Sequence, residues 1–447
     1  MRALFHKLLH IESRSISASA LTIGAGTLIN GVLSIGRNIL LAAHFGASSQ
    51  LDAYFAAFRI PDLIFLLIIT GGLSAVFIPT FSRELAESKE KAWEFAAKII
   101  NGYLLLSLVL AVVLLAMMPL LMHMLVPGFN KEKLDITIRL ARLLLLQPIL
   151  LGISSLASGA LQTLNKFFIT TIAPILYNLG IICGILFLSP FLGIQGVVFG
   201  VLLGALAHST LQLIAFLGSG YNHKFRLLTL QELMGVIALA LPRVLNIILI
   251  QINLVITLNF ISHLANGSVA IFNFAYDMYN YPLNIFAISL ITASFPALAK
   301  LYAQSKHKFA QLFFSTFKKL IGLGVLFFIM FAYGGEIIVR YFLQHGSLKP
   351  ESAAAISAVL MYLNIGIVAS ALLPYLVRVS FILESTTTPL LTSLLNTGLY
   401  IILGPIFLQK YGLSGIAFAL STALWCDVGL LAVLMSYKIK TIARTFA

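Results

Sequence analysis

Long apolar stretches alternate with short polar segments along the whole chain, and this pattern predicts a bundle of membrane-spanning helices. A helix needs about 20 predominantly apolar residues to cross the hydrocarbon core of a bilayer. The stretches lack the short alternating pattern of a membrane β-barrel. We therefore predict an all-α membrane protein with about 12 transmembrane helices, at 17–44, 53–80, 95–124, 134–160, 167–189, 193–218, 232–262, 269–299, 312–340, 352–382, 387–408 and 412–437.

The two halves of the chain resemble each other. The segment GIQGVVF at 193–199 recurs as GLSGIAF at 412–418, and NLG at 178–180 recurs as NTG at 396–398, at an offset of 218 to 219 residues. Small residues that help helices to pack would explain any one pair. Several pairs at one offset favour duplication. We predict an N-lobe at 1–220, a cytoplasmic linker at 221–231 and a C-lobe at 232–447, related by a pseudo-two-fold axis and flanking a central cavity.

Composition and charge agree with a membrane protein. Hydrophobic residues make up 60% of the chain and charged residues 10%, and the formal net charge is +14. Lys and Arg concentrate in every second loop, which the positive-inside rule places in the cytoplasm together with both termini. This location explains the basic charge better than nucleic-acid binding does. The main exceptions are Lys131, Lys133, Lys349 and Lys410.

Motifs for covalent chemistry are missing from the sequence. There is no P-loop, no Ser/His/Asp arrangement in a helpful context and no metal-ligand cluster. The two cysteines, Cys183 and Cys426, lie far apart in apolar segments. We therefore expect a transporter rather than an enzyme, without a cofactor and without ATP. An ion gradient, the membrane potential or a substrate gradient would drive it, and a coupling Na⁺ or H⁺ stays open.

Ionisable groups inside spans are costly and usually face a cavity or a partner, so they are the candidate site residues. Two arginines one helical turn apart, as in the fourth span, favour an anionic ligand such as phosphate. A helix cap is an alternative role for Asp52, and an interfacial position is an alternative for Arg139. The candidates in the first half are Arg37, Asp52, Arg59, Asp62, Arg139 and Arg142.

The second half offers a different set of candidates. Arg243 follows a proline, and Asp427 lies in the last span. Asp277 is flanked at helical spacing by Asn273, Tyr276 and Asn280, which predicts a polar stripe. Asp277 could bind a cation or pair with Arg243, and a structural ion pair is an equal alternative.

Several motifs make the chain similar to a known family. They are FGASSQLDAYFAAFRIPD at 45–62, GGLSAVFIP at 71–79, VPGF at 126–129, LNKFF at 164–168 and APILYN at 173–178. These segments resemble the MurJ (MviN) lipid II flippase family of the MOP exporter superfamily, across nearly the whole chain. The resemblance implies an alternating-access transporter in the bacterial inner membrane, which moves undecaprenyl-diphosphate-linked peptidoglycan precursor outwards. Cavity arginines would bind the diphosphate, with Arg37, Asp52 and Arg59 on charged positions of the family.

The chain also departs from the family pattern. Gly31, Phe65 and the pair Tyr276-Asp277 stand where cationic residues are usual, and two further C-terminal helices that are common in the family do not follow. Arg139, Arg142 and Arg243 are candidates to replace the missing cations. Alternative functions are transport of another polyprenyl-linked glycan, ion-coupled multidrug export and a non-transporting scaffold that recruits cell-wall synthesis proteins.

Overall fold

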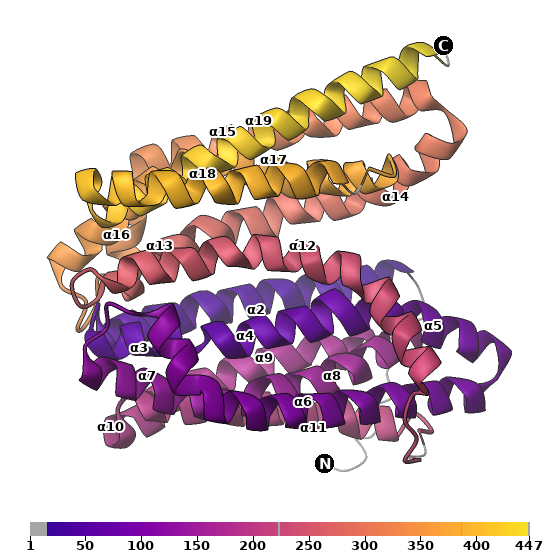
Figure 1. Ribbon diagram of the computed structural model, residues 1–447, viewed down its shortest axis with the longest axis horizontal. Coiled ribbons are helices and arrows are strands. Elements are labelled where there is room, and N and C mark those ends of the chain that lie inside the picture. Colours follow the sequence, from indigo (N-terminus) through magenta and orange to yellow (C-terminus); the bar gives the residue numbers. More distant parts are fainter. Residues whose placement is uncertain (1–15, 222–223, 386, 446–447) are drawn as a thin grey trace. The chain divides into compact units, whose positions relative to one another are not determined.

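Two compact helical units make up the protein in a computed structural model that describes residues 16–221, 224–385 and 387–445. The first unit extends to Ile248, except for Phe45–Ser48, and the second unit comprises that short segment and the residues from Leu249 onwards. All regular elements in the described part of the chain are helices, and within each unit they run roughly along one direction (Figure 1).

The first unit contains the helices of the first half of the chain. Three segments labelled η are turns of wider π-helix within longer helical stretches, and two of them belong to this unit. The elements are α2 (Ile16–Phe45), α3 (Ser49–Ala57), α4 (Arg59–Phe65), η1 (Leu66–Leu73), α5 (Ser74–Glu87), α6 (Lys89–Leu125), α7 (Lys131–Leu144), α8 (Leu146–Thr163), α9 (Phe167–Cys183), η2 (Gly184–Leu188), α10 (Ser189–Leu192) and α11 (Ile194–Leu217).

The second unit contains the helices of the second half. Helix α12 (Leu230–Ser262) begins in the first unit and ends in the second. The elements that follow are α13 (Ser268–Pro282), η3 (Leu283–Ala287), α14 (Ile288–Gln304), α15 (Lys306–Leu343), α16 (Pro350–Asn364), α17 (Ile367–Ile382), α18 (Thr387–Tyr411) and α19 (Leu413–Thr445).

The described helices are long and apolar enough to cross a membrane. Nine qualify by length and composition, and the pair α16–α17, bent by 49°, would make a tenth. Their outer faces are apolar: Val112 and Met124 of α6 are 68% and 67% exposed, as expected where lipid covers the surface. The predicted all-helical membrane fold is confirmed, whereas the count of twelve spans stays a prediction.

The repeat seen in the sequence is also present in the structure. The π-helical turn that begins at Leu66 has a counterpart 217 residues later at Leu283 (283 − 66). The caps of α6 and α15 are Ser88 and Ser305, again 217 residues apart (305 − 88), and both accept a hydrogen bond from a first-turn N–H. Corresponding stretches of the two halves therefore fold alike.

Glycines bring α9 and α11 into very close contact in the first unit. A Cβ added at Gly180 would lie 2.3 Å from the Cα of Gly204, and one added at Gly184 would lie 2.6 Å from the Cα of Gly200. The spacing of four residues on each helix puts both glycines of a pair on one face. This packing fixes the position of α9, which carries several of the polar side chains described next.

Candidate functional site

Arg37 of α2 is the centre of a polar network between α2 and α9. Its Nη1 donates to Asn178 Oδ1 at 3.2 Å, its Nη2 to Ser34 Oγ at 3.4 Å and its Nε to Asn38 Oδ1 at 3.3 Å. Asn178 in turn donates to Asn30 Oδ1 at 2.8 Å. All these partners are uncharged, so they orient the guanidinium without cancelling its charge. An oriented guanidinium can bind a phosphate through two parallel hydrogen bonds.

A second polar cluster lies beside the first and is centred on Asp62 of α4. Gln147 of α8 donates its Nε2 to Asp62 Oδ1 at 3.4 Å and to the hydroxyl of Tyr177 at 3.2 Å. Asp62 lies within the electrostatic influence of Arg59 and Arg37. Because Tyr177 and Asn178 are adjacent on α9, this helix connects the two clusters. The structure thus brings Arg37, Arg59 and Asp62 into one region of the first unit.

Asp52 of α3 has a different environment. It is fully buried, and the Nζ of Lys133, at the start of α7, lies 2.5 Å from its Oδ2. The same Nζ lies 4.0 Å from the centre of the Phe129 ring. A buried ion pair of this kind joins α3 to α7. The sequence marked both residues, Asp52 as a candidate ligand and Lys133 as an exception to the charge rule, but it gave no sign that they meet.

The remaining candidates of the first half lie on α7 and are exposed. Arg139 and Arg142 lie on the surface of this helix. Arg142 donates its Nε to the carbonyl oxygen of Leu115 on α6 at 3.2 Å. This contact directs the Arg142 side chain toward the neighbouring helix. The side chain of Arg243 lies outside the residues that the structure describes.

The second unit holds a polar cavity of about 250 Å³. Asn253 of α12, Asn280 of α13 and Asn396 of α18 line it, and Tyr276 contributes from the predicted polar stripe. Asp427 of α19 is the one charged residue among the described residues of this lining. Asp277 itself is half-buried on α13.

Two oxygen atoms in this cavity wait for a hydrogen-bond donor. Asp427 is 3% exposed, and within the described part of the chain neither its Oδ1 nor the Oδ1 of Asn253 has a hydrogen-bond partner. Asn253 donates its Nδ2 to Asn396 Oδ1 at 2.8 Å. Unpartnered buried acceptors beside a carboxylate favour a positively charged ligand.

The duplicated asparagines give the two units opposite polarity. Asn178 contacts a guanidinium in the first unit, whereas its counterpart Asn396 lines a cavity with a carboxylate in the second. Sequence reasoning noted this pair only as evidence for the repeat. A stronger signal was available, because both are amide side chains inside apolar spans, where polar groups need partners. Gln147 and Tyr177 were missed for the same reason.

Helical units that repeat within the chain, with charged groups held inside apolar spans, define a polytopic membrane transporter. A family model described as lipid II flippase MurJ matches residues 41–446. The chain belongs to this family.

Curated relatives and solved structures agree with this assignment. A probable lipid II flippase MurJ of Rhizobium tropici is 26% identical over 92% of this chain and 79% of its own length. The lipid II flippase MurJ of Thermosipho africanus is 27% identical over 95% of this chain and 86% of its own length. A solved lipid II flippase MurJ in an inward closed conformation aligns with a TM-score of 0.79 and 25% identity, over 95% of this chain and 90% of that one.

A more distant similarity defines the wider fold. An inward-facing multidrug transporter of the MATE family, in the MOP superfamily, aligns with a TM-score of 0.77 and 16% identity, over 94% of this chain and 96% of that one. At this level of identity only the fold is shared. The predicted MOP-type fold is therefore confirmed.

Proposed function

We propose that this protein flips lipid II, the lipid-linked peptidoglycan precursor, across the bacterial cytoplasmic membrane by alternating access and without enzymatic chemistry. Membership of the flippase family supports the cargo. The observation that carries the proposal at the site is Arg37, whose guanidinium is held inside the first unit by uncharged partners. Its charge is therefore available to a ligand, and the diphosphate is the part of the cargo that carries negative charge.

Each side chain of the two clusters has a role in this proposal. Arg37 binds a phosphate oxygen pair, and Asn178 and Ser34 keep its fork in the binding orientation. Arg59 adds positive charge close to Asp62, and Asp62 limits the net charge so that the diphosphate can leave again. Arg139 and Arg142, which are exposed on α7, would guide the headgroup rather than hold it. Weak release would otherwise limit turnover, because binding the ground state tightly does not speed transport.

Complementation in a bacterium depleted of its own lipid II flippase tests this function. Lipid II exposed on the outer leaflet is measured for the wild type, Arg37→Ala, Arg37→Lys and the control Arg83→Ala, whose exposed side chain pairs with its neighbour Glu84. We expect restored exposure for the wild type and the control, a loss for Arg37→Ala and a partial loss for Arg37→Lys, because lysine cannot bind bidentately. A well-inserted wild type that restores nothing would contradict the proposal.

We further propose that a monovalent cation, Na⁺ or H⁺, binds in the cavity of the second unit and is coupled to transport. The carboxylate of Asp427 and the unpartnered oxygen of Asn253 support this. Asp427→Asn keeps the shape of the side chain and removes its charge, so it should abolish the dependence of lipid II flipping on the cation. Flipping by purified protein in vesicles, measured against Na⁺ concentration and against pH, identifies the ion. An unchanged cation dependence in Asp427→Asn would refute the coupling.

A further inference from the structure

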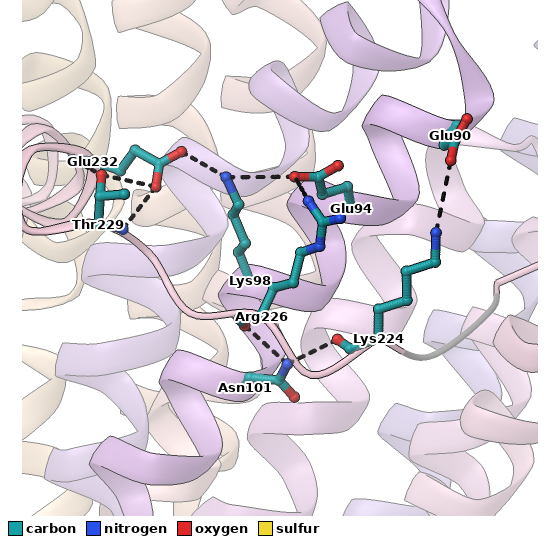
Figure 2. Close-up of polar contacts among 8 residues, drawn as sticks. All are labelled: Glu90, Glu94, Lys98, Asn101, Lys224, Arg226, Thr229 and Glu232. Atoms are coloured by element: carbon teal, nitrogen blue, oxygen red, sulfur yellow. Dashed lines mark hydrogen bonds and ion pairs between the residues drawn. The ribbon is translucent and has the colours of Figure 1, made fainter.

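The chain between α11 and α12 lies along one face of α6, and we call residues 224–229 with the first turn of α12 the strap (Figure 2). Its contacts with α6 come from four residues, Glu90, Glu94, Lys98 and Asn101, at the spacing that puts them on one side of the helix. All of them belong to the first unit. The family assignment does not explain why a connecting segment should be held so fully.

The buried part of this contact is made by Asn101. Its side chain is 5% exposed, and its Nδ2 donates to the carbonyl oxygens of Lys224 at 3.2 Å and of Arg226 at 2.9 Å. One amide thus fixes the backbone of the strap at two points. Just before the strap, Tyr221 packs against Trp93 of α6 and Phe216 of α11, with ring centres 5.8 Å and 4.5 Å apart. The path of the chain is therefore defined from both ends.

Charged pairs set the register of the strap on α6. Lys224 pairs with Glu90 at 3.7 Å, Arg226 pairs with Glu94, and Glu232 pairs with Lys98 at 2.8 Å. The signs run negative, negative, positive along α6 and positive, positive, negative along the strap. A slip of one helical turn in one direction would place Arg226 against Lys98, and a slip in the other direction would place Glu232 against Glu94. Both alternatives bring like charges together, so one register is selected.

The strap also starts α12. The Thr229 N–H donates to Glu232 Oε2 at 2.7 Å, and the Glu232 N–H donates to Thr229 Oγ1 at 3.3 Å, which is a capping box. Glu232 therefore caps the helix and contacts Lys98 with the same carboxylate. Because α12 continues into the second unit, a fixed first turn determines where movement of that helix can begin.

We propose that Asn101, Glu94 and Lys98 are positioning residues that keep the strap seated on α6 throughout the transport cycle, so that movement of the second unit relative to the first begins beyond the first turn of α12. This inference rests on the proposed flippase function. The strap is then a fixed anchor, and it binds no substrate. Loosening it should slow the conformational change and leave lipid II binding intact.

Charge reversal tests the anchor with a matched control. Lys98→Glu should lower the rate of lipid II flipping in vesicles about tenfold, while lipid II binding by the purified protein changes less than about twofold. Lys91→Glu makes the same charge change on α6 outside the strap contacts, and it should leave both quantities within about twofold. Adding Glu232→Lys to Lys98→Glu should restore most of the rate. Equal flipping rates in Lys98→Glu and the wild type would overturn the proposal.

A reversible bridge distinguishes an anchor from a latch that must open. In a background of Cys183→Ser and Cys426→Ser, Lys98→Cys with Glu232→Cys is joined by a short bifunctional thiol reagent. The anchor predicts that the bridge raises the reduced flipping rate of this variant and that a reductant lowers it again. Loss of flipping on bridging, reversed by the reductant, would show that the strap opens and would refute the anchor. Failure of the flippase function itself would appear separately, as absence of lipid II flipping by the wild type.

Discussion

Two charged side chains of the first unit meet the cost of an apolar environment in opposite ways. Asp52 is paired directly with Lys133 at 2.5 Å, so its charge is used within the fold. Arg37 is surrounded by neutral hydrogen-bond acceptors, so its charge stays available. The first arrangement is typical of a structural contact between helices and the second of a ligand site. This difference ranks Arg37 above Asp52 as a substrate contact.

The pair of Asp52 and Lys133 predicts a large effect on stability. Lys133→Ala leaves a buried carboxylate without its partner, which costs about 3–5 kcal/mol when a buried pair is broken. Asp52→Leu combined with Lys133→Leu removes both charges and should cost less than Lys133→Ala alone. Thermal unfolding of the purified proteins in detergent measures both effects. A double variant that unfolds at a lower temperature than Lys133→Ala would show that the pair is not the cause.

Asn178 predicts a change in binding without a loss of stability. Asn178→Asp places a carboxylate 3.2 Å from the Arg37 guanidinium, at the position of the present amide oxygen. The new ion pair would hold Arg37 firmly and cancel its charge, so we expect lipid II binding to weaken about tenfold and thermal stability to stay unchanged or rise. Asn178→Ala is the comparison, because it removes the orienting contact and keeps the charge. If Asn178→Asp binds lipid II as tightly as the wild type, Arg37 does not bind the diphosphate.

At the scale of elements, the contact between α9 and α11 controls the site from a distance. The asparagine that contacts Arg37 lies two residues before Gly180, so a shift of α9 moves it away from α2. A side chain at Gly184 or Gly200 would collide with backbone atoms of the facing helix, which cannot move aside as a flexible side chain can. The glycines therefore determine how deeply the two helices interlock.

Substitution at this crossing should separate the two helices. Gly200→Leu adds a side chain where a Cβ alone would lie 2.5 Å from the Cα of Gly184, so we expect a loss of about 1–3 kcal/mol or failure to insert. Gly102→Ala on α6 is the control, because a Cβ there meets no atom within 4 Å. Detergent-extractable yield and thermal unfolding are the measurements. Wild-type yield and stability for Gly200→Leu would mean that the helices are further apart.

The sequence predicted the elements better than the contacts between them. Apolar runs, the caps at Ser88 and Ser305 and the repeat are local signals, and the structure reproduces them at the predicted offset. Arg37 was identified as a site candidate because its position inside an apolar run is also local. Its partner Asn178 is 141 residues away, and Lys133 is 81 residues from Asp52. Such pairs depend on how the helices pack, and periodicity alone carries no information about it.

At the scale of each unit, basic loops gather at one end. In the first unit, Lys166 donates to Ser219 Oγ at 2.9 Å and Lys224 pairs with Glu90, so three loops that are distant in sequence meet. In the second unit, the Lys438 ammonium donates to the carbonyl oxygen of Leu383 at 3.2 Å, which joins the end of α19 to the loop before α18. These loops are the ones that the positive-inside rule places in the cytoplasm.

Loops poor in charge gather in the same way in the second unit. A Cβ at Gly46 would lie 2.5 Å from the Ser347 carbonyl oxygen, and one at Gly267 would lie 2.4 Å from that of Ala47. The segments around residues 46, 267 and 347 are therefore in direct contact. Their common position, and the grouping of the basic loops, supports helices that cross the bilayer in alternating directions.

This arrangement predicts which loops face the cytoplasm. In a background of Cys183→Ser and Cys426→Ser, single cysteines are introduced at exposed positions by Glu87→Cys, Gln304→Cys, Gln50→Cys or Lys349→Cys. A membrane-impermeant maleimide should label the last two in intact spheroplasts and the first two only after permeabilisation, because basic loops remain in the cytoplasm. Labelling of Glu87→Cys and Gln304→Cys from opposite sides would mean that an odd number of spans separates them. The two halves would then be inverted repeats, and a shared orientation of the duplicated Asn178 and Asn396 networks would be excluded.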